Sequence, residues 1–205
     1  MIKNVIKCNR CNECIGIKSE SEDSSFNNQL SCASFFIKKC WVVKKMNDKY
    51  MNIAINEAKK AYLRDEIPVG CVIVFKGRII ARSFNIKEKK KCAIYHAEII
   101  AIKKACAKLK NWRLNECEMY VTMFPCPMCA SAIKQSRISK VYYIVDNYNN
   151  SISKEIFCSN DLNKGVVVEK INDNHNYIEL VESFFQKNRN KVVEKWYFSW
   201  YMLYY

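Results

Sequence analysis

Hydrophobic positions in the middle of the chain alternate between a helical spacing and short apolar runs. Apolar side chains recur every three or four residues over 51–62, as they do on one face of an amphipathic helix. Two apolar segments follow, over 71–75 and 78–84, and the Lys76-Gly77 step between them predicts a β-hairpin. The polar, lysine-rich stretch 87–91 is expected to be a loop.

The same alternation continues toward the C-terminus. We expect helices over 96–109 and from 126 onward, and strands over 118–123 and 140–145. The first of these helices has apolar residues available for a buried face, namely Ile99, Ile100, Ala105, Cys106 and Leu109. This order of elements predicts a three-layer α/β domain whose two later helices lie side by side on one face of the sheet.

The periodicity weakens after residue 146. A loop with one helical turn is expected over 147–163, an edge strand over 166–171 and a helix over 178–188. The segment 191–205 is rich in aromatic residues, and an irregular tail is favoured over a partner-binding, membrane-interface or base-stacking element.

Residues 1–45 differ from the rest, since they hold five cysteines, a polar middle and no sustained period. Three of these cysteines have the spacing of metal ligands, namely Cys8, Cys11 and Cys14. Cys32 or Cys40 would supply a fourth ligand. A poorly ordered extension with incidental thiols is the favoured interpretation. We therefore predict a Cys-rich extension over 1–45, a catalytic domain over 46–190 and an aromatic tail over 191–205.

The composition indicates the kind of binding partner and the cellular compartment. A formal net charge of +14 in 205 residues favours a polyanion such as nucleic acid, although a biased composition rich in Lys, Asn and Ile is the alternative. The chain contains no run of about 18 uncharged apolar residues, so no membrane span is predicted. The twelve cysteines do not resemble a secreted disulfide framework, so a reducing, cytoplasmic location is expected. Organellar targeting is disfavoured by the acidic residues near the start.

Two short motifs carry the chemistry: His96-x-Glu98, and Pro125-Cys126 followed by Cys129. One imidazole and two thiolates are the ligands of a catalytic zinc that keeps its fourth position open for water. A purely structural zinc normally has four protein ligands, and no fourth is evident, since His175 lies far along the chain. The pair of motifs is the signature of zinc-dependent base deaminases.

The signature specifies roles for its residues. We expect one Zn²⁺ per monomer, held by His96, Cys126 and Cys129. Zinc lowers the pKa of bound water from 15.7 to about 7, and the resulting hydroxide attacks the amidine-like carbon of a base. Glu98 is expected to be the proton shuttle between the water, the ring nitrogen and the leaving ammonia.

Further motifs resemble the cytidine deaminase-like superfamily and, within it, the tRNA-specific adenosine deaminases of bacterial type. They are Ile67 to Val74, His96 to Ile102, Asn111 to Leu114, Tyr120 to Thr122, Pro125 to Ala130 and Ser136 to Ile138. The resemblance implies an α/β/α fold with a mixed five-stranded sheet, and usually a homodimer, a heterodimer being possible. It implies deamination of adenosine to inosine, by attack at C6, at the wobble position of an anticodon stem-loop.

The resemblance also assigns substrate contacts. Asn85 matches a residue that hydrogen-bonds the target base, and Ala97 a position whose backbone helps to hold it. Asn147 aligns with an Asp in a loop that touches flanking nucleotides. The chain departs from the family pattern at Tyr95, Phe124 and the stretch 146–150, which leaves the substrate open, so a free-base or nucleoside deaminase is an alternative. A non-catalytic, RNA-binding subunit of a heterodimer is another, although the intact Glu98 argues against it.

Overall fold

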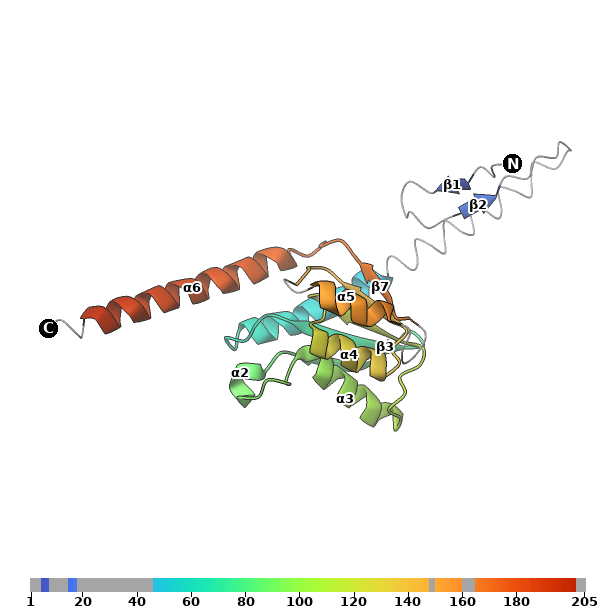
Figure 1. Ribbon diagram of the computed structural model, residues 1–205, viewed down its shortest axis with the longest axis horizontal. Coiled ribbons are helices and arrows are strands. Elements are labelled where there is room, and N and C mark those ends of the chain that lie inside the picture. The colour runs from blue at the N-terminus through green and yellow to red at the C-terminus, as the bar shows by residue number, and fades with distance from the viewer. Residues whose placement is uncertain (1–4, 8–14, 18–45, 148–149, 160–164, 202–205) are drawn as a thin grey trace, which may run out of the picture. The chain divides into compact units, whose positions relative to one another are not determined.

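The computed structural model describes the backbone of residues 5–7, 15–17, 46–147, 150–159 and 165–201 (Figure 1). The chain divides into two compact units, Met1–Asn47 and Asp48–Tyr205. In the first unit, β1 (Val5–Lys7) pairs antiparallel with β2 (Ile15–Ile17). Neither strand was expected, because three residues are too few for an alternating pattern to stand out. The cysteines with metal-like spacing lie outside the described residues, as do 202–205 at the end of the predicted aromatic tail.

A mixed five-stranded sheet forms the centre of the second unit. Its strands are β3 (Gly70–Phe75), β4 (Arg78–Phe84), β5 (Cys117–Val121), β6 (Lys140–Tyr143) and β7 (Val167–Lys170). The order is β4-β3-β5-β6-β7, with β3 antiparallel to both neighbours and β5, β6 and β7 mutually parallel. The predicted hairpin and the edge strand are confirmed.

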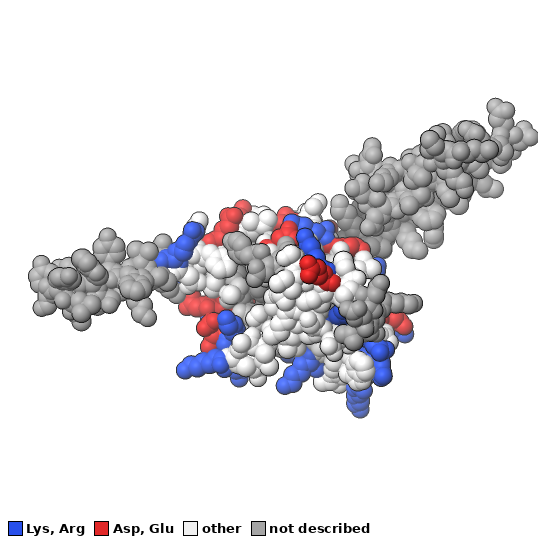
Figure 2. Space-filling view, viewed as in Figure 1, with Lys and Arg blue, Asp and Glu red and all other residues white. Residues whose placement is uncertain are grey.

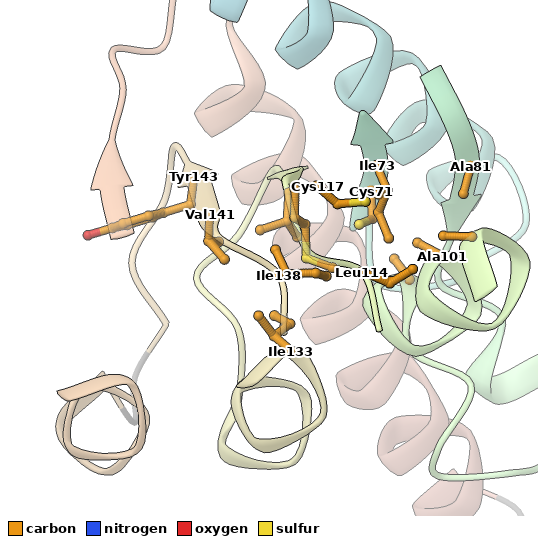
Figure 3. Close-up of a cluster of buried hydrophobic side chains, with 14 of the residues drawn as sticks. Cys71, Ile73, Ala81, Ala101, Leu114, Cys117, Ile133, Ile138, Val141 and Tyr143 are labelled. Carbon is orange, nitrogen blue, oxygen red and sulfur yellow. The ribbon is translucent and has the colours of Figure 1, made fainter. Parts of the chain in front are cut away.

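Helices cover both faces of this sheet. One face carries α3 (Ala97–Leu109), α4 (Pro127–Gln135) and α5 (Asn150–Cys158), with a core that includes Ile73, Met119 and Val141 (Figure 3). The other face packs against the helix over 46–62 and the start of α6 (Tyr177–Tyr201). The three-layer α/β/α fold is confirmed, with α3 and α4 adjacent on one face as expected.

The face by which α3 contacts the sheet only partly matches the expected one. Its fully buried apolar positions are Ala97, Ala101 and Ala105, spaced by four residues. Figure 3 shows Ala101 beside Ala81 of β4. Of the five residues expected on this face, only Ala105 is fully buried, and Ile99 and Ile100 are partly exposed. Small side chains let the helix approach the sheet closely, so alanines occupy the centre of the contact, while the expected Cys106 and Leu109 pack against it partly buried.

Three segments expected to be irregular are helical. The stretch expected as a loop contains α2 (Lys87–Lys90), whose first N–H groups are bound by the Glu66 carboxylate. The segment expected to hold one helical turn is the nine-residue α5, in which Ser153 and Phe157 share the buried face. The backbone of α6 continues to Tyr201, because neither Gly nor Pro interrupts it, so an irregular tail is wrong for 191–201. The domain boundaries stay predictions.

Gly70, the first residue of β3, lies so close to the helix over 46–62 that no side chain fits at this position. A Cβ atom at this position would lie 1.9 Å from the carbonyl oxygen of Ala54 on the helix over 46–62. The same step also binds α6, since the Tyr177 hydroxyl donates to the carbonyl of Pro68 at 2.8 Å. None of the described helices is long and apolar enough to cross a membrane.

Candidate active site

The two motifs meet at the N-terminal ends of α3 and α4. His96 is the N-cap of α3 and Cys126 is the N-cap of α4, both with extended backbones (φ −75°, ψ 153° and φ −68°, ψ 167°). Pro127 follows at the first helical position, where its fixed φ is compatible with the helix. Cys129 lies one turn later and is fully buried. Each motif is therefore a helix start, where backbone N–H groups lack intrahelical partners and favour negative charge.

Three ligand atoms converge there. The Nδ1 atom of His96 lies 3.6 Å from the Sγ atom of Cys126 and 3.6 Å from that of Cys129. Among the described residues, these three form the one group of metal-binding side chains whose ligand atoms all lie within 4.8 Å of one another. The sequence predicted all three.

The donor set fits zinc. With Zn–N near 2.0–2.1 Å and Zn–S near 2.3 Å, tetrahedral angles require an N···S separation of about 3.6 Å. The observed distances agree with this value. Three protein ligands are typical of catalytic zinc sites, whereas structural sites have four. The arrangement is therefore that of a zinc centre with an open position.

The two thiols are electrostatically unequal. A hydrogen bond from Cys129, reinforced by His96, lowers the pKa of Cys126 to about 4. The same contact with Cys126, together with burial, raises the pKa of Cys129 far above its usual value. The hydrogen bond with Cys126 also raises the pKa of His96. One thiolate is thus already favoured in this cluster, which is the form that binds zinc.

Glu98 lies in the first turn of α3 beside the three ligands. Its side chain is buried, with 4% exposed, and burial raises the pKa of its carboxyl group above the usual value. It belongs to no group of ligands but interacts electrostatically with His96, Cys126 and Cys129. A buried carboxyl beside an open metal position is placed to exchange protons with a reacting group.

A pocket of about 910 Å³ opens over His96, Glu98 and Cys126. One side is formed by residues that follow β4 (Asn85 and Lys87). Another is formed by residues that follow β5 and β6, namely Met123, Phe124, Val145, Asp146 and Asn147. The α6 side, as we call it, consists of Ile178, Val181, Glu182, Phe185, Gln186 and Arg189. A cavity of this size exceeds the needs of a single base.

The predicted substrate contacts fall at different places. Asn85 and Asn147 both line the pocket, as expected of groups that touch substrate. Ala97 is fully buried and does not line it, and its carbonyl accepts a hydrogen bond from the Ser83 hydroxyl at 2.6 Å. All three roles stay predictions, since the contacts depend on a bound substrate.

Sequence reasoning missed Glu66, Lys87 and the α6 side of the pocket. The α6 residues follow helical spacing and mostly lie within the expected helix over 178–188, but that spacing does not say what the helix face contacts. Lys87 lies in a run of lysines that resembles an ordinary solvated surface. Glu66 precedes Ile67-Pro68 and carried no sequence signal of burial.

Comparisons with known proteins agree with this geometry. Residues 44–145 match the family model for the cytidine and deoxycytidylate deaminase zinc-binding region. The tRNA-specific adenosine deaminase of Bacillus subtilis is 47% identical over 97 residues, which are 47% of this chain and 60% of that relative. The Aquifex aeolicus protein of the same name is 35% identical over 148 residues, covering 70% of this chain and 97% of that relative.

Solved structures lead to the same group. A structure from a study of A-to-I editing by tRNA:A34 deaminases at the wobble position of transfer RNA has a TM-score of 0.57 and 35% identity. It aligns with 60% of this chain and 98% of its own. The coverage of the Aquifex relative and the zinc-binding match together establish that this chain belongs to the zinc-dependent family of tRNA-specific adenosine deaminases.

Proposed function

We propose that this protein hydrolyses adenosine to inosine at the wobble position of tRNA anticodons. The observation that carries the proposal is the zinc site with three ligands and a buried, non-ligating Glu98 at the base of a large pocket. Similar relatives are named as tRNA-specific adenosine deaminases. The chloroplastic tRNA(adenine(34)) deaminase of Arabidopsis thaliana is 42% identical over 102 residues, which are 50% of this chain and 8% of that relative. The reaction forms a C6–O bond from water and breaks the C6–N bond, which releases ammonia.

Each residue at the base of the pocket has a role. His96, Cys126 and Cys129 hold zinc, which supplies Lewis-acid chemistry that makes water a nucleophile at neutral pH. Glu98 accepts a proton from the water, delivers it to the adenine ring nitrogen and assists the departure of ammonia. Its burial excludes bulk water from these transfers. Asn85 and Asn147, which both line the pocket, orient the nucleotide, and Ala97 supports it through the backbone.

The pocket and the charge suit an RNA loop. An anticodon-loop base is already largely unstacked, so turning it into an active site costs little. Lys87 and Arg189 both line the pocket, and their cationic groups suit phosphate. In the view of Figure 2, Lys and Arg side chains project along the edge of the domain where α2 and α3 lie. A free base would leave this basic surface without a partner.

The test compares three substrates for the purified, zinc-loaded full chain. They are an anticodon stem-loop with adenosine at the wobble position, the same stem-loop with guanosine there, and a panel of free bases and nucleosides. Inosine and ammonia are measured. We expect inosine from the first substrate alone. Turnover of small molecules only would reject the tRNA proposal in favour of a nucleobase or nucleoside deaminase, and no turnover at all would favour a subunit of a heterodimer.

We also propose that the protein is a homodimer. Apolar side chains are exposed next to two of the zinc ligands, namely Ile94, 55% exposed, and Met128, 36% exposed. The resemblance to a usually homodimeric family is the basis of the proposal, and these two side chains are candidates for the subunit interface. Light scattering at micromolar concentration should give twice the monomer mass of 24.1 kDa. A monomeric mass would support assembly with a different subunit.

A cytoplasmic location is the corresponding proposal for the cell. The described cysteines are free thiols, and most of them are at least partly buried. Free thiols persist in reducing compartments. Fractionation of the source cells should recover the protein with soluble cytoplasmic markers, and recovery with an organelle would reject the proposal.

A further inference from the structure

A buried carboxylate outside the catalytic cluster lies directly behind one side of the pocket. Glu66, in the segment between the helix over 46–62 and β3, has 0% of its surface exposed. Within the described part of the chain it forms no ion pair, and its partners are N–H groups. A buried charge is stabilised only when hydrogen bonds compensate its lost hydration. The N–H groups that donate to Glu66 are therefore held strongly by its carboxylate.

One partner is the amide of Asn85. Its Nδ2 atom donates to the Glu66 Oε2 atom across 3.4 Å, and Asn85 itself is 4% exposed. An ionised carboxylate accepts hydrogen bonds and donates none, so it attracts the NH₂ end of the amide and repels the carbonyl end. The orientation of Asn85 is thus fixed from behind, and its Oδ1 atom is directed away from Glu66.

The other partners are backbone N–H groups of α2. The N–H of Glu88 donates to Glu66 Oε2 at 3.0 Å, and that of Lys89 donates to Oε1 at 2.7 Å. These bonds begin the four-residue helix that holds Lys87 at the pocket. Both oxygens of Glu66 accept hydrogen bonds from the protein, and its complete burial keeps them away from the substrate.

We propose that Glu66 is a positioning residue that acts through Asn85. It selects the amide orientation that presents Oδ1 as a hydrogen-bond acceptor to the nucleotide, and it anchors the adjoining start of α2. The inference rests on the proposed function, since Asn85 must contact substrate for its orientation to matter. Glu66 itself touches neither the zinc ligands nor the pocket.

A double-mutant cycle on the full chain tests this role with the anticodon stem-loop as substrate. Glu66→Gln keeps the shape but replaces one acceptor oxygen with a donor. We expect kcat/KM to fall about tenfold or more, the range for lost hydrogen bonds to a charged group. In an Asn85→Ala background the same change should cost less than about twofold, because coupled residues are not additive. A full additional loss in that background would overturn the proposal.

An exchanged pair provides a second measurement that does not depend on the stability of the single variant. Asn85→Asp places a carboxylate against Glu66, and turnover should nearly disappear. Adding Glu66→Gln restores a donor–acceptor pair and still presents an oxygen to the pocket, so kcat/KM should recover at least about tenfold. No recovery, with zinc content intact, would overturn the proposal.

Glu57→Gln is the matched control. Glu57 is a second buried carboxylate, 6% exposed, whose partner is Lys60, 2.7 Å away on the same helix. Glu57 does not line the pocket, so kcat/KM of the Glu57→Gln variant should stay within about twofold of that of the parent chain. Failure of the parent chain itself to deaminate the stem-loop would reject the proposed function. An active parent with an unaffected Glu66→Gln variant would reject the positioning role alone.

Discussion

The Nδ1 atom of His96 and the Sγ atom of Cys126 lie 3.6 Å apart, although 30 residues separate them in the chain. Each residue caps a helix, so the distance depends on how α3 and α4 lie next to each other on the sheet. Alanines on α3 and the buried Ala130 and Ile133 on α4 bring the helix starts together. The site is consequently a product of core packing, and zinc binding should in turn stabilise the fold.

The first prediction separates metal binding from proton transfer. Cys126→Ala removes a ligand and should reduce zinc content to a small fraction of one equivalent, with a lower Tm and no turnover. Glu98→Gln keeps every ligand, so zinc should remain near one equivalent while kcat falls about 10²- to 10⁴-fold, the contribution of general acid–base catalysis. Elemental analysis and stem-loop turnover measure the two effects. Full activity of Glu98→Gln would contradict the proton-transfer role.

A second prediction concerns Gly70, where β3 meets the helix over 46–62. Gly70→Ala should lower the free energy of unfolding by at least about 1–3 kcal/mol, because overpacking displaces backbone that cannot yield easily. Urea denaturation measures the change. Gly165→Ala is the control, since a Cβ atom there has its nearest neighbour at 3.9 Å and should change stability by less than about 0.5 kcal/mol. Equal effects of the two substitutions would contradict the packing argument.

The catalytic cluster was predictable from sequence because zinc binding and proton transfer require particular residue types at particular separations. His96, Glu98, Cys126 and Cys129 form a pattern in which ligand type and separation both matter, and the structure brings all four together. The β-hairpin and the two helices that carry the motifs were predictable for a similar reason, since their periodicity is strong.

Other parts of the site depend on information that periodicity does not contain. The buried face of α3 was decided by the size of its alanines, and Ile99 is partly exposed despite its greater hydrophobicity. The helix α2 depends on a carboxylate more than 20 residues earlier in the chain, at Glu66. The α6 side of the pocket depends on tertiary contacts such as that of Tyr177 with Pro68. Long-range contacts of this kind leave no local pattern.

A third prediction concerns pH and the start of α6. The Asp173 carboxylate accepts N–H bonds from Ile178 at 2.8 Å and from Tyr177 at 3.0 Å. Burial acts to raise the pKa of Asp173, but the N–H bonds dominate and hold it below its usual value. A lowered folded-state pKa contributes stability that is present above the unfolded value, about 3.9, and lost as pH falls through the folded value.

Asp173→Ala should therefore destabilise the protein by about 0.5–2 kcal/mol at pH 7, the usual cost of losing such a cap. The difference should shrink as pH falls below about 4. Denaturation with urea at several pH values measures it. The neighbouring exposed Asn172→Ala is the control and should show no such dependence. A constant difference between pH 7 and pH 3 would rule out the ionised cap.

Phe124 is the subject of a fourth prediction, since it is one of the positions at which the chain departs from the pattern of the family that it resembles. Here the ring is 3% exposed, with its centroid 4.7 Å from that of Tyr143 and 6.1 Å from that of Phe157 on α5. Phe124→Glu would bury a carboxylate without a partner and should lower stability by about 3 kcal/mol or more. Phe124→Leu should cost about 1.5 kcal/mol or less. Thermal unfolding distinguishes them, and an unaffected Glu variant would show that α5 does not depend on this contact.

The last prediction concerns the lysines of α2 and its C-cap. Lys89, Lys90 and Lys91 are exposed beside the pocket, on a segment whose backbone is fixed by Glu66. Each lysine that contacts a phosphate of single-stranded RNA should contribute about 0.7 to the slope of log affinity against log salt concentration. Changing all three to Gln should flatten that slope and weaken stem-loop binding, most strongly at low salt. Lys103 and Lys108 of α3 and its C-cap Lys110 provide the control with the same loss of charge, since they are exposed and lie beyond the N-terminal turn of α3 that forms the site. An identical change of slope in both triple variants would show that net charge, rather than the position of the lysines, governs binding of the RNA.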